Sequence, residues 1–382
     1  VLAESCLRQG KPVFPDGAAV LVGLTAGEME TLLRRLAGEE PSPAPAAEDA
    51  GNTRTITDGR GRTVTLPDQV SSVACVGVGA LRYTTYLGAQ DLAVGVEQDE
   101  RDATLSKPFS YFNRELFDTL PLTGDNGATY DEEILALRPD VLVANLDAQS
   151  ADDLQSRLGI PVVAIAHNEG IFDENALTTL EVLGQVYHKE DRAQALTDYL
   201  LDAQADLSRR TQDIPQERKP TVYVGGVSYK GHHGFEGTEA GYAPLAAIGA
   251  VNLADETGQS GPFNIDTEQV LTWDPDVIFL DYNGMDLIRE NYAAAPDFYN
   301  ALTAVREGRL YAQISFRSSA TNAELALADA YYAGTVLYPE AFADVDMEEK
   351  FDEIFSTMLG VEDAYAQYTA QGYVFGPMTL EG

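Results

Sequence analysis

One sequence pattern occurs twice in this chain. The first copy is Asp131-Glu-Glu-Ile-Leu-Ala-Leu-Arg-Pro-Asp-Val-Leu-Val-Ala-Asn145, and the second is Thr267-Glu-Gln-Val-Leu-Thr-Trp-Asp-Pro-Asp-Val-Ile-Phe-Leu-Asp281. In each copy an amphipathic helical stretch ends at a Pro-Asp pair, because proline stops a helix. The apolar run that follows is short and β-rich, as in a buried strand. Two copies far apart predict two similar lobes rather than a longer repeat array.

The similarity extends outwards from these cores. Residues 73–76 and 221–224 are apolar runs, and each is followed by glycines and then by a helical stretch that ends near residue 89 or 250. Strands that alternate with helices predict an α/β fold with parallel sheets covered by helices. In such sheets ligands bind beyond the carboxyl ends of the strands. We therefore expect two similar lobes with parallel sheets, joined by a long linker helix, with the ligand cleft between the lobes.

The chain divides into five segments by composition and pattern. Residues 175–212 lack proline and read as the linker helix, which Gly184 or residues 189–191 can interrupt. Residues 53–67 alternate around Asp58 and Gly59, which predicts a hairpin. The predicted segments are a small N-terminal unit of unknown role (1–36), a Pro/Ala linker (37–52), an N-terminal lobe (53–168), a linker-helix region (169–218) and a C-terminal lobe with closing helices (219–382).

The net charge of −36 excludes a nucleic-acid binder, which needs a basic face. An acidic surface suits a salty or extracellular medium, and the sequence does not separate the two. No apolar run is long enough to span a bilayer. The chain begins at Val1, without a visible signal peptide, as a mature or trimmed form does.

The chain has two cysteines, Cys6 and Cys75. Cys75 lies in the first predicted core strand, so we expect a buried free thiol. Cys6 can be lipidated, free or paired with Cys75, and the preceding residues 3–5 are a poor lipidation motif. Two cysteines alone make no zinc or iron–sulfur site.

Taken together, the order of these features resembles the helix-linked (class III, siderophore and vitamin B12 type) substrate-binding proteins of ABC importers. The resemblance covers roughly residues 53–360. It rests on both Pro-Asp repeats, the linker helix and three further stretches, namely residues 62–67, 77–82 and 304–311. It implies an extracytoplasmic protein, periplasmic or anchored at the cell surface as a lipoprotein. Its partners would be an ABC permease and its ATPase. We expect a monomer that is not an enzyme and carries no cofactor.

The resemblance also implies a docking site for the permease. Family members dock through a surface glutamate on each lobe, and here Glu132 and Glu268 stand seven residues before Pro139 and Pro275. Two such acids can pair with basic permease residues and fix orientation. Alternatively, each is a first-turn glutamate that favours its helix dipole.

Candidate ligand contacts are the residues just past predicted strands. Arg82 lies near a helix N-terminus, where its guanidinium can grip a carboxylate or oxyanion; an ion pair within the lobe is the alternative. The stretch 229–242 is rich in glycine, histidine and aromatic residues. Arg317 is a second cation that we expect to face Arg82 across the cleft. The predicted ligand-binding residues are Arg82, Tyr83, Tyr111, Asn145, Tyr229, His232, His233, Asp281, Tyr282 and Arg317, with His167 and Asn168 as further strand-end candidates.

The ligand class follows from these residue types. A bare zinc or manganese site needs about three histidines and a carboxylate, and here His233 is the candidate metal ligand among few histidines. Two arginines and 19 tyrosines suit a bulky anionic or aromatic ligand better. We expect a metal chelate, first a ferric siderophore and second haem. A cobalamin, a bare metal and a non-transport enzyme on this fold are alternatives, although no nucleophile elbow, phosphate loop or full dinucleotide fingerprint is present.

Overall fold

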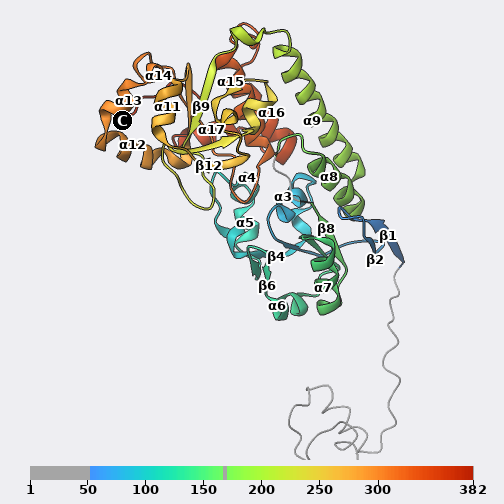
Figure 1. Ribbon diagram of the computed structural model, residues 1–382. Coiled ribbons are helices and arrows are strands. Elements are labelled where there is room, and N and C mark those ends of the chain that lie inside the picture. The colour runs from blue at the N-terminus through green and yellow to red at the C-terminus, as the bar shows by residue number, and fades with distance from the viewer. Residues whose placement is uncertain (1–51, 167–169, 382) are drawn as a thin grey trace, which may run out of the picture. The chain divides into compact units, whose positions relative to one another are not determined.

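The computed structural model describes residues 52–166 and 170–381. Residues 53–382 belong to one structural unit, and Figure 1 shows its two lobes. We keep the predicted bounds as names: the N-lobe is 53–168, the linker is 169–218 and the C-lobe is 219–382. The predictions that lie outside the described residues are those for the unit 1–36, for nearly all of the 37–52 linker, for Cys6, and for His167 and Asn168.

The N-lobe contains a six-stranded sheet in the order β6-β5-β4-β3-β7-β8. All neighbouring strands are parallel except β5 and β6. Its strands are β3 (Val73–Val76), β4 (Ala93–Glu97), β5 (Leu122–Asp125), β6 (Ala128–Thr129), β7 (Val141–Asn145) and β8 (Val162–Ile165). Its helices are α3 (Ala80–Tyr86), α4 (Pro108–Tyr111), α5 (Arg114–Phe117), α6 (Asp131–Leu137) and α7 (Ala148–Leu158).

The C-lobe contains a four-stranded parallel sheet in the order β11-β9-β13-β14 and an antiparallel pair, β10 and β12. Its strands are β9 (Thr221–Gly225), β10 (Gly237–Ala240), β11 (Val251–Asn252), β12 (Gly261–Asn264), β13 (Val277–Asp281) and β14 (Leu310–Gln313). Its helices are α10 (Ala243–Ala247), α11 (Thr267–Trp273), α12 (Met285–Ala294), α13 (Pro296–Ala301), α14 (Thr303–Arg306), α15 (Ala323–Leu337), α16 (Met347–Leu359) and α17 (Ala364–Ala370).

The two sheets confirm the predicted duplication. The order β4-β3-β7-β8 in the N-lobe matches β11-β9-β13-β14 in the C-lobe. The repeated sequences are α6 with β7 and α11 with β13. Each helix ends in a left-handed residue, Arg138 at φ 52° and Asp274 at φ 45°, directly before the proline. The local rule that proline ends a helix therefore gives both lobes the same helix-to-strand corner.

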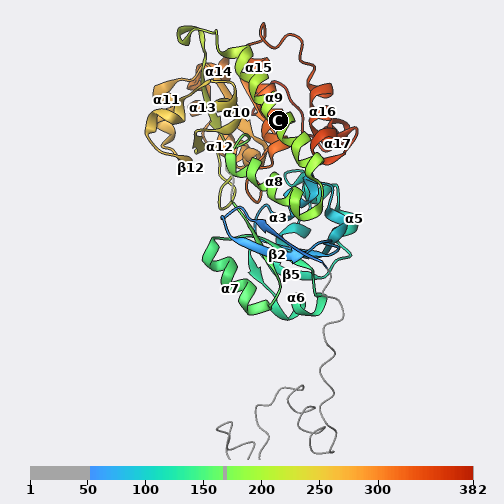
Figure 2. The ribbon, with the colours of Figure 1, turned by 90° about the vertical axis from the view of Figure 1, so that its right-hand side faces the viewer.

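The linker consists of two helices rather than one continuous helix. α8 (Glu174–Tyr187) and α9 (Glu190–Thr211) are separated by His188, which adopts a left-handed conformation, and by Lys189. The interruption adjoins the break predicted at residues 189–191. A hairpin of β1 (Thr53–Thr57) and β2 (Thr63–Pro67) forms as predicted and lies against α8. Figure 2 shows the hairpin over the N-lobe, with α9 running from there to the C-lobe.

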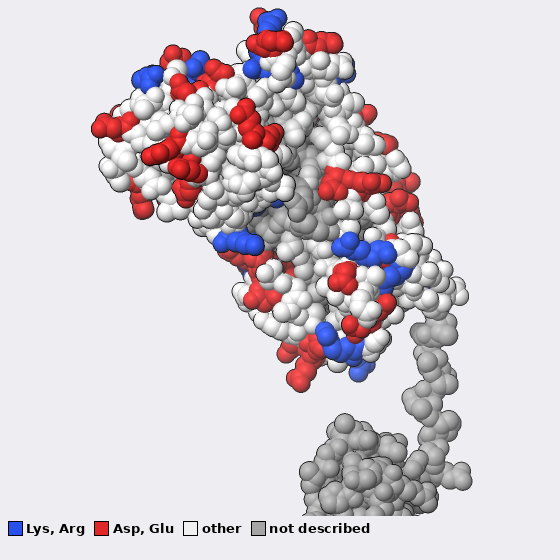
Figure 3. All heavy atoms as spheres, viewed as in Figure 1, with Lys and Arg blue, Asp and Glu red and all other residues white. Residues whose placement is uncertain are grey.

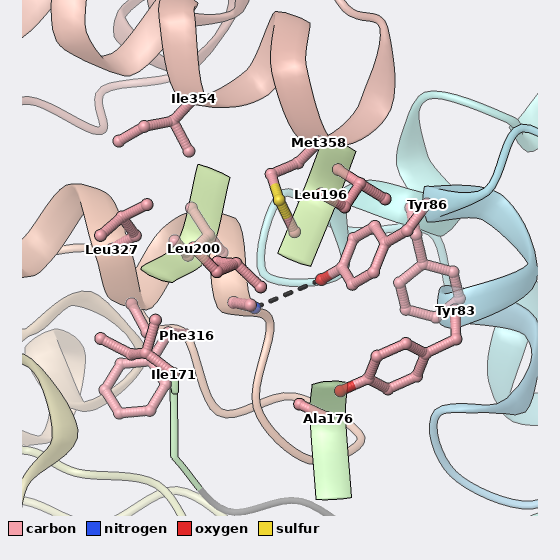
Figure 4. Close-up of a cluster of buried hydrophobic side chains, with 14 of the residues drawn as sticks. Tyr83, Tyr86, Ile171, Ala176, Leu196, Leu200, Phe316, Leu327, Ile354 and Met358 are labelled. Atoms are coloured by element: carbon pink, nitrogen blue, oxygen red, sulfur yellow. Dashed lines mark hydrogen bonds between the residues drawn. The ribbon is translucent and has the colours of Figure 1, made fainter. Parts of the chain in front are cut away.

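One apolar core extends through both lobes and the linker. Figure 4 shows Tyr83 and Tyr86 of α3 beside Leu196 of α9 and Met358 of α16. All four side chains are buried. A shared core of this kind resists separation of the lobes, because opening would expose apolar surface. Cys75 of β3 is a buried free thiol within the same core.

No helix in the described ranges is long and apolar enough to cross a membrane. On the face shown in Figure 3, acidic side chains are spread over both lobes and basic ones form only small groups. This distribution agrees with the 61 acidic and 25 basic residues of the chain.

Candidate functional site

The first strand of each lobe ends in a glycine turn. Gly77 follows β3 with φ 75°, and Gly226 follows β9 with φ 81°. A side chain at Gly226 would come within 3.1 Å of the Asp281 carbonyl oxygen. The backbone N–H of Gly77 donates to the Glu97 carboxylate at 2.9 Å. Burial, partly offset by this hydrogen bond and one from Gly127, raises the pKa of Glu97.

Arg82 lies in α3 and is fully buried. Its Nε donates to Asn322 Oδ1 at 3.0 Å, and its Nη2 donates to the carbonyl oxygens of Ser318 and Ser319. Its Nη1 has no hydrogen-bond partner among the described residues. In this structure the guanidinium therefore holds a C-lobe loop against the N-lobe instead of lining an open cleft.

Further polar contacts join the lobes beside Arg82. Tyr86 donates to the buried Glu324 carboxylate and accepts from the backbone N–H of Ala323 at 3.2 Å, the dashed bond in Figure 4. Ser106 Oγ lies 3.2 Å from Asn283 Oδ1. These contacts of Arg82, Tyr86 and Ser106 hold the N-lobe against the C-lobe.

The other predicted N-lobe contacts have partners within the protein. Tyr83 is buried and packs edge-to-face against Tyr86 at 5.5 Å. The hydroxyl of Tyr111 accepts from Gln371 Nε2 at 2.7 Å. Asn145 Nδ2 donates to the Val78 carbonyl oxygen at 2.8 Å.

The glycine-rich stretch after β9 brings three predicted residues together. The rings of Tyr229 and His233 stack at 4.2 Å, and His233 Nε2 lies 2.9 Å from the Tyr229 carbonyl oxygen. His232 is exposed, with Nδ1 2.8 Å from the Asn283 carbonyl oxygen. Within the described ranges no three His, Cys, Asp or Glu side chains form a group that could hold a metal ion.

Asp281 and Tyr282 stand at the end of β13. Asp281 is buried and accepts hydrogen bonds from Ser315 Oγ and from the Asn283 backbone N–H. Burial, opposed by these hydrogen bonds, raises the pKa of Asp281 to about 7. The Tyr282 hydroxyl donates to the Val374 carbonyl oxygen at 3.0 Å, so this tyrosine ties down the C-terminal segment.

Arg317 follows β14 and makes a two-point ion pair with Glu239 of β10. Its Nε donates to Glu239 Oε2 at 2.6 Å, and its Nη2 contacts Oε1. The side chain of Glu239 is 2% exposed and that of Arg317 is 17% exposed. The guanidinium also lies over an aromatic ring, with Arg317 Cζ 5.5 Å from the Phe316 ring centroid.

A cavity of about 480 Å³ lies beside this ion pair. The four residues directly before α8, one residue of α9 and the C-lobe around β10 line it, so the linker and the C-lobe share the pocket. Of the ten predicted ligand-binding residues, Arg317 lines it. Its lining residues are Gly170, Ile171, Phe172, Asp173, Gln204, Glu239, Ala240, Gly241, Ala243, Ala246, Ala247, Gly261 and Arg317.

The residue pattern of the sequence did not point to Glu239, Asp173 or Gln204 as pocket residues. Glu239 lies within the stretch 229–242, in which the histidines and tyrosines were the predicted contacts. An acid in a short run of small residues was the available signal. Asp173 is also the N-cap of α8, where its side chain accepts from the Asn175 N–H. Gln204 is one polar residue on a long helix, and nothing in the sequence distinguishes it.

The predicted docking residues are on the surface. Glu132 and Glu268 are both exposed and both lie in the first turn of their helices, α6 and α11. The two helices differ at their N-termini: Asp266 caps α11 through its side chain, whereas Tyr130 makes no side-chain cap for α6.

Comparison with known proteins places the fold. A family model described as periplasmic binding protein matches residues 73–313. The molybdate-binding protein MolA of Haemophilus influenzae is 24% identical over 329 residues, which are 79% of this chain and 90% of the relative.

Two solved structures show the same fold. A periplasmic solute binding protein from Veillonella parvula is 20% identical, with a TM-score of 0.67 and coverage of 81% of this chain and 94% of its own. An ABC-type Fe³⁺-hydroxamate transport protein from Saccharomonospora viridis is 19% identical, with a TM-score of 0.51 and coverage of 75% and 99%.

Proposed function

The chain belongs to the periplasmic binding protein family, and on that premise we propose that it captures a ferric siderophore and delivers it to an ABC permease. The resemblance seen in the sequence is confirmed at the level of the family and the fold. The protein is extracytoplasmic, and it works with a permease and an ATPase as its relatives do.

The size of the pocket beside the Glu239–Arg317 ion pair supports a bulky ligand. Its volume of about 480 Å³ lies in the usual range for small-molecule sites, about 300–1,000 Å³. A tetrahedral oxyanion occupies roughly 120–150 Å³, or four to five water shares of about 30 Å³ each, and would leave most of this space empty. Glycine and alanine supply much of the lining, and because their side chains are small they leave room for a chelate. The hydroxamate-transport neighbour from Saccharomonospora viridis supports the same ligand class.

Delivery to the permease would use Glu132 and Glu268. Both carboxylates are exposed at equivalent positions of the repeat, so each lobe presents one acid to a basic partner. Opposite charges at two separated points steer the encounter and set orientation. In this proposal the residues do not contact the ligand.

Molybdate is the second candidate ligand. The relative from Haemophilus influenzae is a molybdate-binding protein and aligns with 79% of this chain. An oxyanion would need a cation that is open to it, and Arg317 is the only lysine or arginine among the described residues that line the pocket.

The test is a binding screen on the purified full chain. Ferrichrome, ferrioxamine B, haemin, cyanocobalamin and molybdate are added in turn, with calorimetry for affinity and absorption spectra for the coloured ligands. Saturable, one-to-one binding of a ferric hydroxamate, weakened by bulky substitution at Ala246, an exposed helical position of the pocket lining, is the expected result. Tight binding of molybdate with no binding of either siderophore would replace the first candidate with the second.

A further inference from the structure

We propose that the pocket selects ligands that are neutral or positively charged overall, and that Glu239 sets this preference by occupying Arg317. This inference rests on the proposed function, because it concerns the ligand of the same pocket. It assigns a specificity role to Glu239 that the residue pattern of the sequence did not indicate.

Glu239 already pairs with Arg317, so the positive charge of the pocket is neutralised by the protein itself. Two hydrogen bonds join the guanidinium and the carboxylate, at Nε and at Nη2, in the side-by-side arrangement that gives arginine its strongest carboxylate contacts. An anionic group on a ligand would bind arginine in that same way. Arg317 therefore already holds a carboxylate where an anionic ligand would have to place one.

Displacing Glu239 is strongly unfavourable because of where it lies. Its side chain is 2% exposed, in a strand that is buried along its whole length. A carboxylate that loses the Arg317 guanidinium there keeps its charge at a poorly solvated position, which costs far more than breaking an exposed pair. An anionic ligand would have to compensate for that loss as well as for its own desolvation.

The other described residues of the lining include no lysine or arginine. Among its described residues the charged side chains are Asp173, Glu239 and Arg317. Two acids and one base make the described part of the lining acidic in sum, which disfavours a trianionic or dianionic ligand and favours a cation. A ferric trishydroxamate has its charge balanced within the chelate and leaves the Glu239–Arg317 pair intact.

The experiment compares four probes on the full chain in low-salt buffer, where charge effects are least screened. Ferrioxamine B is a cationic complex, ferrichrome is neutral, ferric enterobactin is trianionic and molybdate is dianionic. We expect the unmodified chain to bind the first two about a hundredfold more tightly than the last two, with the difference shrinking as salt is added.

Glu239→Gln keeps the shape of the side chain and removes its charge, so it removes the carboxylate that competes with an anion for Arg317. We expect about a tenfold gain in affinity for ferric enterobactin or molybdate and little change for ferrichrome. Glu256→Gln is the matched control, since it also removes one negative charge but at an exposed position of the C-lobe. It should change none of the four affinities appreciably. Glu239→Asp keeps the charge and should retain the selectivity of the unmodified chain.

Each outcome bears on one of the two proposals. Equal or tighter binding of ferric enterobactin by the unmodified chain overturns the charge selection and leaves a siderophore-binding function standing, whereas tight binding of molybdate alone overturns both proposals. Loss of affinity for anions in Glu239→Gln overturns it as well. If none of the four probes binds the unmodified chain, the siderophore function fails and the charge selection falls with it. The comparison of probes on the unmodified chain needs no variant to fold.

Discussion

Asp140 and Asp276 occupy equivalent positions in the two lobes, and each carboxylate holds the start of its lobe's first strand. Asp140 Oδ2 accepts from the backbone N–H and the hydroxyl of Ser71, each at 2.8 Å. Asp276 Oδ2 accepts from the backbone N–H and the hydroxyl of Thr221, also at 2.8 Å. In return the backbone N–H of Asp140 donates to the hydroxyl of Ser72, directly before β3, and that of Asp276 donates to the hydroxyl of Thr221, each at 3.0 Å. In each Pro-Asp pair the proline therefore ends a helix and the aspartate anchors the neighbouring strand.

Replacing Asp140 by asparagine should destabilise the protein and flatten its acid response. Partial burial raises the pKa of Asp140, but the hydrogen bonds from Ser71 and Ser72 outweigh it and lower the pKa below the ordinary value. The stabilisation is therefore complete above about pH 4 and is lost as the pH falls through the lowered pKa. We expect Asp140→Asn to reduce the free energy of unfolding by about 1–2 kcal/mol at neutral pH, since the site is largely solvated.

Urea unfolding at pH 7 and at pH 3 measures this effect. Glu133→Gln in α6 is the control, because Glu133 is exposed and also loses one charge. Equal loss of stability in both variants at pH 7 would mean that net charge, and not the strand anchor, is responsible.

The repeat made much of the architecture predictable, because its rules are local. Pro139 and Pro275 end helices through their own ring geometry, and apolar runs of four or five residues become strands once they are buried. The alternation of strands and helices then predicts parallel sheets that are covered by helices, whereas the order of the strands comes from the structure. The break in the linker depends on one left-handed residue, His188, and the sequence indicated only that the helix could be interrupted nearby.

The site was less predictable, because its contacts connect distant parts of the chain. Arg317 meets Glu239 across 78 positions, and Arg82 meets Asn322 across 240. Sequence alone showed that both arginines follow strands and can bind an anion. Which partner each one takes depends on how the lobes close, and no local pattern carries that information.

Asp281→Asn should remove a distinct pH dependence of stability. Burial raises the pKa of Asp281 to about 7, above its value of about 3.9 in an unfolded chain. The folded state therefore binds this proton more tightly, so stability is greatest below about pH 4 and falls as the pH rises to about 7. One such group contributes a slope of at most about 1.4 kcal/mol per pH unit.

The measurement is urea unfolding from pH 4 to pH 8 for the unmodified chain and the variant. Asparagine can keep both hydrogen bonds, because Ser315 Oγ and the Asn283 N–H both donate to Oδ1. We expect the variant to lose the slope and to gain stability above pH 7. Asp286→Asn, at an exposed position of α12, should keep the slope; identical pH profiles for all three proteins would contradict the assignment.

Tyr86→Phe should loosen the contact between the lobes. The hydroxyl of Tyr86 serves the buried carboxylate of Glu324 and the backbone N–H of Ala323. Both groups would be left buried without that partner, and we expect a loss of about 1–3 kcal/mol in the free energy of unfolding. Hydrogen exchange should quicken at the start of α15. Tyr130→Phe is the comparison, since Tyr130 is 43% exposed, and unchanged exchange at α15 in both variants would argue against the contact.

Gly184→Ala should disturb the junction of α8 and α9. A side chain at Gly184 would meet Ala193 Cβ of α9 at 2.7 Å, and the Lys189 carbonyl oxygen at 3.5 Å. Overpacking costs typically about 1–3 kcal/mol, which exceeds the gain of about 1 kcal/mol from the better helix propensity of alanine. The melting temperature should therefore fall. Gly376→Ala has no atom within 4 Å of the new side chain and should leave the melting temperature unchanged; a stabilised Gly184→Ala would show that the helices can separate freely there.

Reversing the charges of Glu132 and Glu268 together should abolish transport and spare ligand binding. Both residues are exposed on α6 and α11, outside the lining of the pocket, so substitution to lysine leaves the pocket unchanged. Each reversal replaces an attraction to a basic permease surface by a repulsion, and like charges at a docking contact oppose association. The single variants should fall between the unmodified chain and the double variant.

The measurement is uptake into membrane vesicles that contain the permease and its ATPase, alongside calorimetry of the siderophore. A control double variant, Glu133→Lys with Glu290→Lys, changes the net charge equally at exposed positions of one helix in each lobe. If the control abolishes uptake to the same degree, net charge rather than these two glutamates governs docking. Retained uptake in the Glu132 and Glu268 double variant would contradict the docking role. Each glutamate would then only stabilise its helix through the helix dipole.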